Sequence, residues 1–268
     1  MNKIYACFPG GKHKVLTMSY DDGKKQDRRL VSLFNEYGIK GTFNINGGIE
    51  GDERRIPFEE YKALYEGHEV ACHTWSHPTI ERCPLTMVAQ EIIEDRKKLE
   101  AMTGYPVRGL AYPNGSYSKE IIDMLPALGI RYGRIVGNTD DFKLPENFLE
   151  WKATCHHNHN LLELGQQFVD LHKKQYLYCM YVWGHSYEFD DKDNWDVMED
   201  FCKLVANRDD IWYATNIEIV DYMDVVKAAQ FSADGSFVHN PMAKSLWLCI
   251  NDRVFLEVKG GETKQLTV

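Results

Sequence analysis

Two adjacent carboxylates, Asp21 and Asp22, stand where a short apolar run ends and a loop begins. Residues 14–20 predict a strand, and residues 24–37 predict a helix after it. In α/β folds the carboxyl end of a strand is the usual place for catalytic side chains. Two neighbouring carboxylates repel each other, so both ionise at neutral pH only when they share a cation or a proton. Taken alone, the Asp-Asp-Gly sequence is equally compatible with a surface turn.

A pair of histidines, His73 and His77, follows the next such junction, after a predicted strand end at residues 68–72. Imidazoles four residues apart can lie on one face and bind one metal ion. With Asp22 they would form a set of three protein ligands, which leaves metal positions open for water and substrate, as in catalytic sites. The alternative is that one histidine caps a helix and the other packs. The presence of Asp21 and Asp22 at the earlier strand end favours the metal-binding interpretation.

Read together, the sequence Thr-x-Ser-Tyr-Asp-Asp-Gly at 17–23 and the sequence His-Thr-x-Ser-His at 73–77 resemble the NodB-type polysaccharide deacetylases, carbohydrate esterase family 4. The resemblance covers about residues 14–224. It implies a distorted (β/α) barrel and a metal-dependent removal of acetyl groups from sugars.

The resemblance also implies roles for the residues of the two motifs. Asp21 would be the catalytic base, and Asp22, His73 and His77 would hold a divalent metal. Nitrogen and oxygen ligands make zinc the first choice, and cobalt, nickel or manganese would also fit.

The third motif of the family usually reads Arg-x-Pro-Tyr, and here it departs from that pattern. Ala111 stands at the Arg position, Pro113 matches, and Asn114 replaces the Tyr. Either Arg108 or Arg134 could supply the missing guanidinium from elsewhere. The backbone N–H at Asn114 would still serve as an oxyanion donor, which needs no particular side chain.

A strongly aromatic strand predicted at 176–183 delivers His185, where the fifth motif of the family has Leu-x-His. Val182 or Trp183 replaces the Leu. The implied role of His185 is general acid, because an imidazole with a pKa of about 6.5 can protonate a leaving group near neutral pH. The alternative is an ordinary loop histidine.

Other residues near these motifs are candidates for contact with substrate. Trp75, Tyr112, Trp183 and Tyr187 could stack on a sugar, although aromatic residues are as often part of the core. Three clustered histidines, His156, His157 and His159, suggest a substrate rim in preference to a second metal site.

Alternating strand and helix patterns predict a parallel sheet. With the resemblance, we expect an α/β fold: a distorted (β/α) barrel of about seven parallel strands over residues 1–230. Residues 139–154 are predicted to be a long loop. Residues 231–268 predict a short antiparallel β extension, too small for an independent domain.

The clearest amphipathic helix is predicted at residues 85–102. Its apolar stripe is expected to face the core, and its charged residues to form a solvated face. The stripe consists of Val88, Ile92, Ile93 and Leu99, and the charged face of Glu91, Glu94, Asp95, Lys97 and Lys98.

Composition narrows the possible partners. A net charge of −9 over 268 residues argues against nucleic acid. No apolar run reaches the length of about 18 residues that a membrane span needs. The N-terminus lacks the apolar core of a signal peptide, and seven scattered cysteines suggest buried free thiols. Both observations favour the cytoplasm, or an extracellular location if a leader has been removed.

The sequence therefore predicts a metal-dependent carbohydrate deacetylase, a hydrolase of carbon–nitrogen bonds other than peptide bonds. Its partner would be an N- or O-acetylated sugar or a small N-acyl substrate. Two alternatives stay open: another amidohydrolase on the same scaffold, and a carbohydrate-binding protein without turnover.

Overall fold

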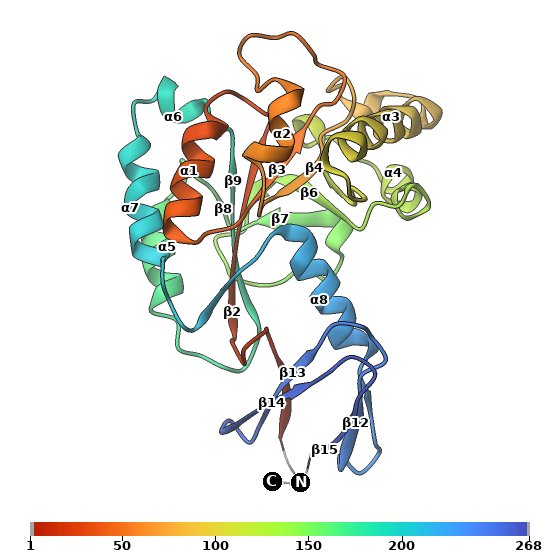
Figure 1. Ribbon diagram of the computed structural model, residues 1–268, viewed down its shortest axis with the longest axis vertical. Helices are drawn as coiled ribbons and strands as arrows, with labels where there is room; N and C mark the ends of the chain where they lie inside the picture. The colour runs from red at the N-terminus through yellow and green to blue at the C-terminus, as the bar shows by residue number, and fades with distance from the viewer. Residues whose placement is uncertain (1–2, 267–268) are drawn as a thin grey trace.

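The computed structural model describes residues 3–266, whose main feature is a curled, entirely parallel sheet (Figure 1). This arrangement confirms the predicted distorted (β/α) barrel. Its strands, in spatial order, are β7 (Trp151–Ala153), β6 (Tyr132–Asn138), β5 (Gly109–Ala111), β4 (Glu69–Cys72), β3 (Gly41–Ile45), β2 (Lys14–Asp21), β9 (Tyr178–Gly184) and β8 (Cys155–His156), and β10 (Ile211–Tyr213) pairs with the first half of β2.

The curled sheet is closed by one short stretch of chain, residues 151–156. Its first half, β7, pairs with β6, and its second half, β8, pairs with β9. Between them, the Thr154 carbonyl accepts a hydrogen bond from Asp140 N, and the Thr154 hydroxyl accepts one from Tyr181 N. Because β7 and a 3₁₀ turn at Phe148–Glu150 form here, the prediction of a loop over residues 139–154 is wrong at its end.

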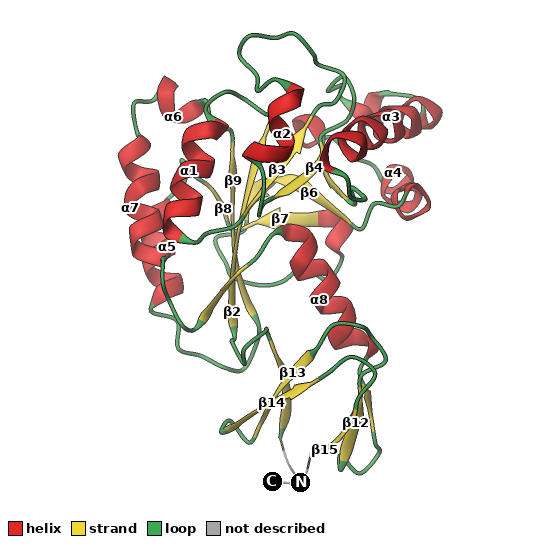
Figure 2. Cartoon of the chain, in the orientation of Figure 1, coloured by secondary structure: helices red, strands yellow, loops and turns green. Residues whose placement is uncertain are grey.

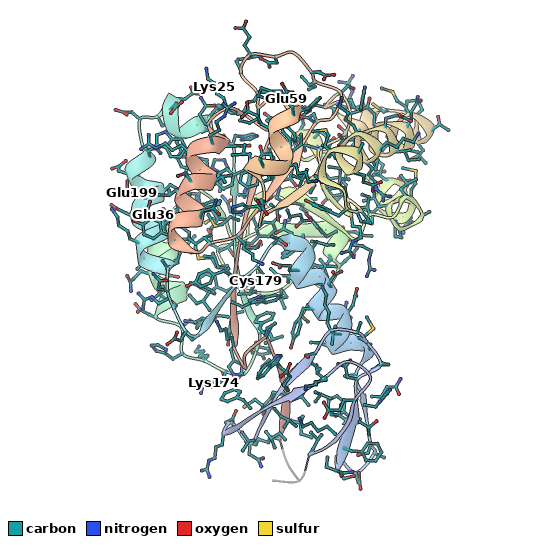
Figure 3. The ribbon with its side chains drawn as sticks, viewed as in Figure 1. Lys25, Glu36, Glu59, Lys174, Cys179 and Glu199 are labelled. Carbon is teal, nitrogen blue, oxygen red and sulfur yellow. The ribbon has the colours of Figure 1, made fainter. Side chains whose placement is uncertain are left out.

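Helices cover the outside of the sheet, and apolar side chains fill the space between (Figures 2 and 3). The barrel helices are α1 (Asp27–Tyr37), α2 (Tyr61–Leu64), α3 (Leu85–Thr103), α4 (Lys119–Met124), α5 (Leu161–Val169), α6 (Glu188–Asp191), α7 (Trp195–Val205) and α8 (Asn216–Ala228). Gly38 ends α1 with a φ of 66°, a conformation that glycine adopts without strain. Thr215 and Glu218 form a capping box at the start of α8. Within residues 3–266, no helix has both the length and the apolar character of a membrane span.

The short strands of the C-terminal extension form two small antiparallel sheets at the end of the barrel where β2 begins (Figure 1). One contains β11 (Gln230–Phe231), β12 (Phe237–His239) and β15 (Thr263–Gln265). The other joins β13 (Leu246–Ile250) and β14 (Val254–Val258) to β1 (Ile4–Cys7) from the start of the chain, a pairing that the sequence pattern did not predict. The extension packs its apolar side chains against Val225 of α8.

The charged face of α3 differs from the prediction. Glu91 is 8% exposed and Asp95 is completely buried, so the expectation of a solvated face is wrong at both positions. The signal was present in the spacing, because residues 88, 92, 95 and 99 form one continuous stripe along the helix. Asp95 therefore faces the barrel together with Val88 and Leu99.

A buried carboxylate, Glu69, links three elements at the start of the parallel strands. It accepts hydrogen bonds from the Thr42 hydroxyl (2.9 Å), the Tyr132 hydroxyl (2.8 Å) and Ile217 N (2.9 Å). Burial raises its pKa from an ordinary value of 4.5 to about 7, although these donors oppose the shift.

We expect Glu69 to make stability depend on pH. As pH rises from 4.5 to about 7, the unfolded chain loses this proton first, so the free energy of unfolding should fall, by on the order of 3 kcal/mol. Glu69→Gln keeps the size of the side chain and cannot ionise, so the fall should be reduced in this variant. Urea unfolding at several pH values measures it, and parallel pH profiles for the two proteins would contradict it.

Candidate active site

Side chains from four strands meet at the carboxyl edge of the sheet. Asp21 is the last residue of β2 and Asp22 follows it; His73 follows β4, Arg134 lies on β6, and His185 follows β9. Because parallel strands present their carboxyl ends at one edge, residues far apart in sequence become neighbours there. The structure thus brings together both predicted carboxylates and the predicted histidines.

Asp22, His73 and His77 form a group whose donor atoms all lie within 4.8 Å of one another. The two imidazole rings are 4.7 Å apart and inclined by 75°. His73 Nδ1 lies 2.8 Å from the Ala111 carbonyl oxygen, so this nitrogen carries the proton and Nε2 presents its lone pair. Burial lowers the pKa of His73 to about 4, which keeps the ring in the neutral form that ligates metals.

The loop that carries both histidines has an unusual backbone. Thr74 and His77 have φ angles of 65° and 60°. Every other non-glycine residue with positive φ in residues 3–266 is an Asn or Asp, which tolerate this conformation, whereas a β-branched Thr does not. Such strain persists only where the surroundings enforce it, and it concentrates at functional sites.

Three polar side chains hold this loop in place. The Asn46 amide donates to the carbonyl oxygens of His73 (2.6 Å) and Thr74 (3.0 Å). Asp95 accepts from Gly47 N (2.6 Å) and His73 N (3.0 Å).

Glu91 completes this support from α3. Its carboxylate accepts from the backbone N–H of Ser76 at 2.8 Å and from the Ser76 hydroxyl at 2.7 Å. The sequence analysis did not assign Asn46, Glu91 or Asp95 to the site. The only signal for the two acids was their position on α3, beside or within its apolar stripe.

Asp21 is 2% exposed and surrounded by positive or hydrogen-donating groups. Arg134 donates to Oδ2, Asn44 donates to Oδ1 at 2.8 Å, and the Nε2 atoms of His73 and His185 lie 3.8 and 3.9 Å from Oδ2. Burial alone would raise the pKa of Asp21, but these neighbours together, with Arg134 the strongest, hold it below its ordinary value. Asp21 is therefore an ionised carboxylate.

The structure resolves which arginine replaces the one missing from the third motif. Arg108 forms a bidentate ion pair with Asp221, at 2.7 and 2.9 Å, and within residues 3–266 it has no hydrogen bond or ion pair with Asp21. Arg134, which is 1% exposed, contacts Asp21 directly. Ala111 on β5 and Arg134 on β6 are paired residues of adjacent strands, so the guanidinium comes from the neighbouring strand.

His185 is oriented by a carboxylate that the sequence analysis missed. Glu188 Oε1 lies 2.8 Å from His185 Nδ1, which leaves Nε2 directed toward Asp21. Burial opposes ionisation of Glu188, but the nearby imidazoles of His156, His157 and His185 hold its pKa far below the ordinary value. The spacing of three residues between His185 and Glu188 was the available signal.

The three clustered histidines have different environments. His157 is 1% exposed and stacks on Phe189, with ring centres 4.2 Å apart, so the prediction that it belongs to a substrate rim is wrong. His156 and His157 both approach Glu188 Oε2, at 3.3 and 3.2 Å. His159 is the most exposed of the three and pairs with Asp140 at 2.9 Å.

The predicted sugar-stacking residues also differ. Tyr112 is completely buried and donates to the Leu149 carbonyl oxygen at 2.7 Å, so its assignment to substrate is wrong. Trp183 is 7% exposed, and its ring face is covered by Arg134 at 4.5 Å. Trp75 is partly exposed and packs against Gly48, where any β-carbon would come within 2.5 Å of the ring. Tyr187 is also partly exposed, so Trp75 and Tyr187 are the two candidates that keep free surface.

Asn114 lies in the turn after β5, with a φ of 55°. Its side-chain amide donates to the Thr79 hydroxyl at 3.1 Å, which connects this turn to the segment that follows His77. Its side-chain amide therefore holds the turn in place.

Comparison with known proteins finds a family that the first half of the chain resembles. Residues 9–133 match the family model described as polysaccharide deacetylase. This segment, which contains both motifs, is therefore similar to the polysaccharide deacetylases, and the match confirms the resemblance that the two motifs carry.

Among curated relatives, a peptidoglycan-N-acetylglucosamine deacetylase of Listeria monocytogenes is 23% identical over 133 residues, which are 49% of this chain and 27% of the relative. The match therefore spans less than a third of that relative's length.

Two solved structures share the fold. A protein of Mycobacterium smegmatis described as a polysaccharide deacetylase superposes with a TM-score of 0.65 at 15% identity, covering 82% of this chain and 93% of that one. A mutant of a Bacillus anthracis carbohydrate esterase family 4 pseudoenzyme, with restored enzymatic activity, gives 0.53 at 16% identity, covering 81% and 70%. Because the fold occurs in a pseudoenzyme, the argument for activity depends on the site residues.

We expect Asp95→Ala to destabilise the protein, because Gly47 N would lose its acceptor in a buried place. A cost of about 2 kcal/mol in the free energy of unfolding is typical for such a group. Asp123→Ala is the matched control, since Asp123 is exposed and pairs only with Lys119 on the same helix; it should cost at most about 0.5 kcal/mol. Urea unfolding compares the two, and equal effects would show that Asp95 is not a support of the loop.

Proposed function

We propose that this protein is a metal-dependent hydrolase that removes acetyl groups from an N- or O-acetylated carbohydrate. The observation that supports it best is the convergence of Asp22, His73 and His77, with donor atoms within 4.8 Å of one another, next to Asp21 and His185. The match of residues 9–133 to the polysaccharide deacetylase model supports the same conclusion.

The residues present fit a divalent cation. Asp22, His73 and His77 would hold it, and the proton on His73 Nδ1 is already fixed by the Ala111 carbonyl. Such an ion, zinc by the ligand types and otherwise cobalt, nickel or manganese, would polarise the acyl oxygen and lower the pKa of a water. Lys24 and Arg55 lie 3.8 and 3.7 Å from the two Asp22 oxygens.

Asp21 is suited to accept the proton of the attacking water. It is ionised because Arg134 and Asn44 stabilise its charge, and their contacts fix the direction of its two oxygens. A positioned carboxylate of this kind acts as a general base only while it is deprotonated.

His185 is suited to protonate the leaving group. Glu188 accepts a hydrogen bond from Nδ1, so Nε2, which lies near Asp21, is the nitrogen that can release a proton to the leaving group. Glu188 and Asp21 favour the imidazolium and raise the pKa of His185 above its ordinary value, against the opposing and largest effect of burial. The backbone N–H of Asn114 remains our proposal for an oxyanion donor.

An amino sugar is the proposed substrate class, since the Listeria relative is named for N-acetylglucosamine. A cavity of about 540 Å³ lies beside Arg55, which contacts Asp22, and could hold part of a glycan. It is lined mainly by residues 49–59, together with Lys25 and Arg28. The mixed charges of this lining suit a neutral, hydroxyl-rich ligand.

Two alternatives have different consequences. An amidohydrolase for a small N-acyl or cyclic amide would use the same residues but would not release acetate from sugars. A binding protein without turnover would have no need for the ionised Asp21 and the Glu188-oriented His185, so their presence disfavours it. Acetate release from acetylated chitooligosaccharides, compared with small N-acyl compounds, distinguishes the three.

The role of Asp21 as base and the role of His77 as metal ligand can be separated by mutation. Asp21→Asn should keep bound metal and lower kcat by about 10²–10⁴, because only the proton acceptor is lost. His77→Ala should lose both metal and hydrolysis. Elemental analysis and acetate release measure the two properties.

His239→Ala is the control for metal content, because His239 lies in the C-terminal extension and contacts Thr263. Unchanged kcat in Asp21→Asn would remove the base assignment, and full metal content in His77→Ala would remove the ligand assignment. Hydrolysis by the metal-free protein would contradict the proposed function, which requires a metal ion.

Arg134 offers a second test. Arg134→Ala leaves Asp21 buried without its cation and should lower kcat at least about a hundredfold. Adding Ala111→Arg to that variant should restore part of kcat, since positions 111 and 134 are paired on adjacent strands. Arg108→Ala, whose guanidinium pairs with Asp221, should leave kcat unchanged. A larger loss in Arg108→Ala than in Arg134→Ala would contradict the assignment.

A further inference from the structure

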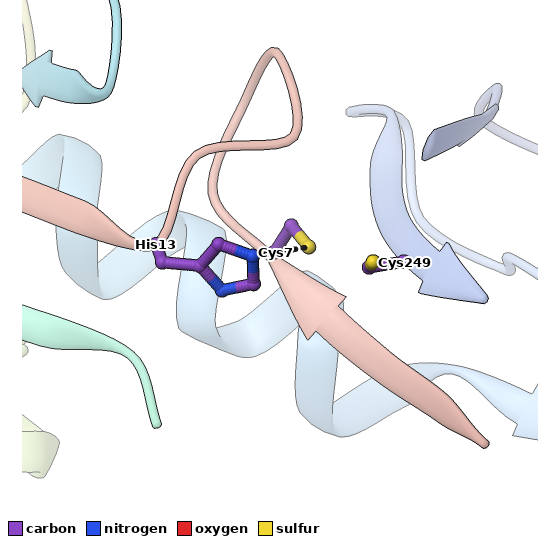
Figure 4. A group of neighbouring side chains, drawn as sticks. All are labelled: Cys7, His13 and Cys249. Atoms are coloured by element: carbon purple, nitrogen blue, oxygen red, sulfur yellow. Dashed lines mark hydrogen bonds between the residues drawn. The ribbon is translucent and has the colours of Figure 1, made fainter. Parts of the chain in front are cut away.

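A second group of metal-binding side chains lies at the opposite end of the barrel. Cys7 on β1, His13 directly before β2, and Cys249 on β13 have their sulfur and nitrogen atoms within 4.8 Å of one another (Figure 4). Cys7 Sγ is 4.0 Å from His13 Nε2. Both cysteines are completely buried and both are free thiols.

The backbone explains why these three residues meet. In the antiparallel pair of β1 and β13, Tyr5 is opposite Cys249, so Cys7, two residues further on, faces the same side of the sheet as Cys249. A tight turn closed by the hydrogen bond from Phe8 N to Lys12 O then returns the chain and brings His13 alongside. The group therefore joins both ends of the chain to the start of the central strand.

The donor atoms suit a thiophilic cation. In a tetrahedral zinc site, with bonds of about 2.3 Å to sulfur and 2.0 Å to nitrogen, ligand atoms lie about 3.6 Å apart. The present separations, at most 4.8 Å, exceed this value by no more than about 1.2 Å, which side-chain rotation can remove. Two thiols that each release a proton would provide two negative charges and neutralise a divalent ion in this buried place.

The surroundings also suit access by an ion. His13 is half-buried and lines a cavity of about 370 Å³, together with residues 171–174 and Phe255. The negative charge of Asp252 acts on both His13 and Cys249 and favours a cation there. Lys174 acts in the opposite sense, but its side chain is exposed and can turn into solvent.

We propose that Cys7, His13 and Cys249 form a zinc-binding site that fastens the N-terminal strand and the C-terminal extension to the start of β2. The fourth position of the ion is left to water on the open side of His13. This site shares no residue with the proposed catalytic centre, and neither depends on the other.

Cobalt(II) distinguishes the two centres in the full-length protein. A thiolate-to-cobalt charge-transfer band can arise only where cysteine is a ligand, and Asp22, His73 and His77 contain no sulfur. We expect the band in the reduced wild-type protein, its disappearance on addition of zinc, and its loss in Cys7→Ser and Cys249→Ser. His77→Ala should retain it. Cys83→Ser is the matched control, because Cys83 is partly exposed and outside the group.

Thermal unfolding gives an independent measurement. Zinc should raise the Tm of wild type and of His77→Ala, since an ion that binds only the folded state stabilises it, and should not raise the Tm of Cys249→Ser. Circular dichroism shows whether each variant is folded, and Cys249→Ala replaces the Ser variant if it is not. The proposal would be overturned if the wild-type protein lacked the charge-transfer band or if both Ser variants kept it. Five titratable thiols before reduction and no band after it would identify a disulfide instead.

Discussion

Buried backbone N–H and C=O groups need partners, and the loop at residues 73–77 shows how much of the site depends on this requirement. Asn46, Glu91 and Asp95 satisfy its carbonyl and N–H groups from two neighbouring elements. Each such group left without a partner costs about 1–3 kcal/mol, enough to offset the strain of a left-handed Thr74. His73 and His77 can therefore face one point although their backbone is unfavourable.

Electrostatics supports the other half of the site in a similar way. Asp21 lies in a place where burial alone would neutralise it, and Arg134, which cannot lose its proton, keeps it charged. Glu188 has the corresponding role for His185. A charged acceptor and a protonated donor can consequently coexist with their closest atoms 3.9 Å apart. The two proton transfers that we propose, to Asp21 and from His185, both depend on these opposite charges.

Much of the fold and of the site could be predicted from sequence, because both depend on local pattern. Apolar runs that end in Asp21 or precede His73 marked strand ends, and matching motif spacing predicted the residues that meet there. The errors concern residues whose role depends on packing. Tyr112 and His157 follow strand segments like the site residues do, but their rings turn into the core.

The same limit explains the residues that were missed or left undecided. In the sequence, Asp95 looks like any charged residue on an amphipathic helix. Its role becomes visible only when the positions of the Gly47 and His73 N–H groups are known. Arg108 and Arg134 are equally plausible in sequence, and only the register of β5 and β6 decides between them. The pairing of β1 with β13 has a further consequence for biosynthesis. Ile4 on β1 pairs with Ile250 on β13, so during synthesis β1 stays unpaired until the whole barrel and β13 have been made.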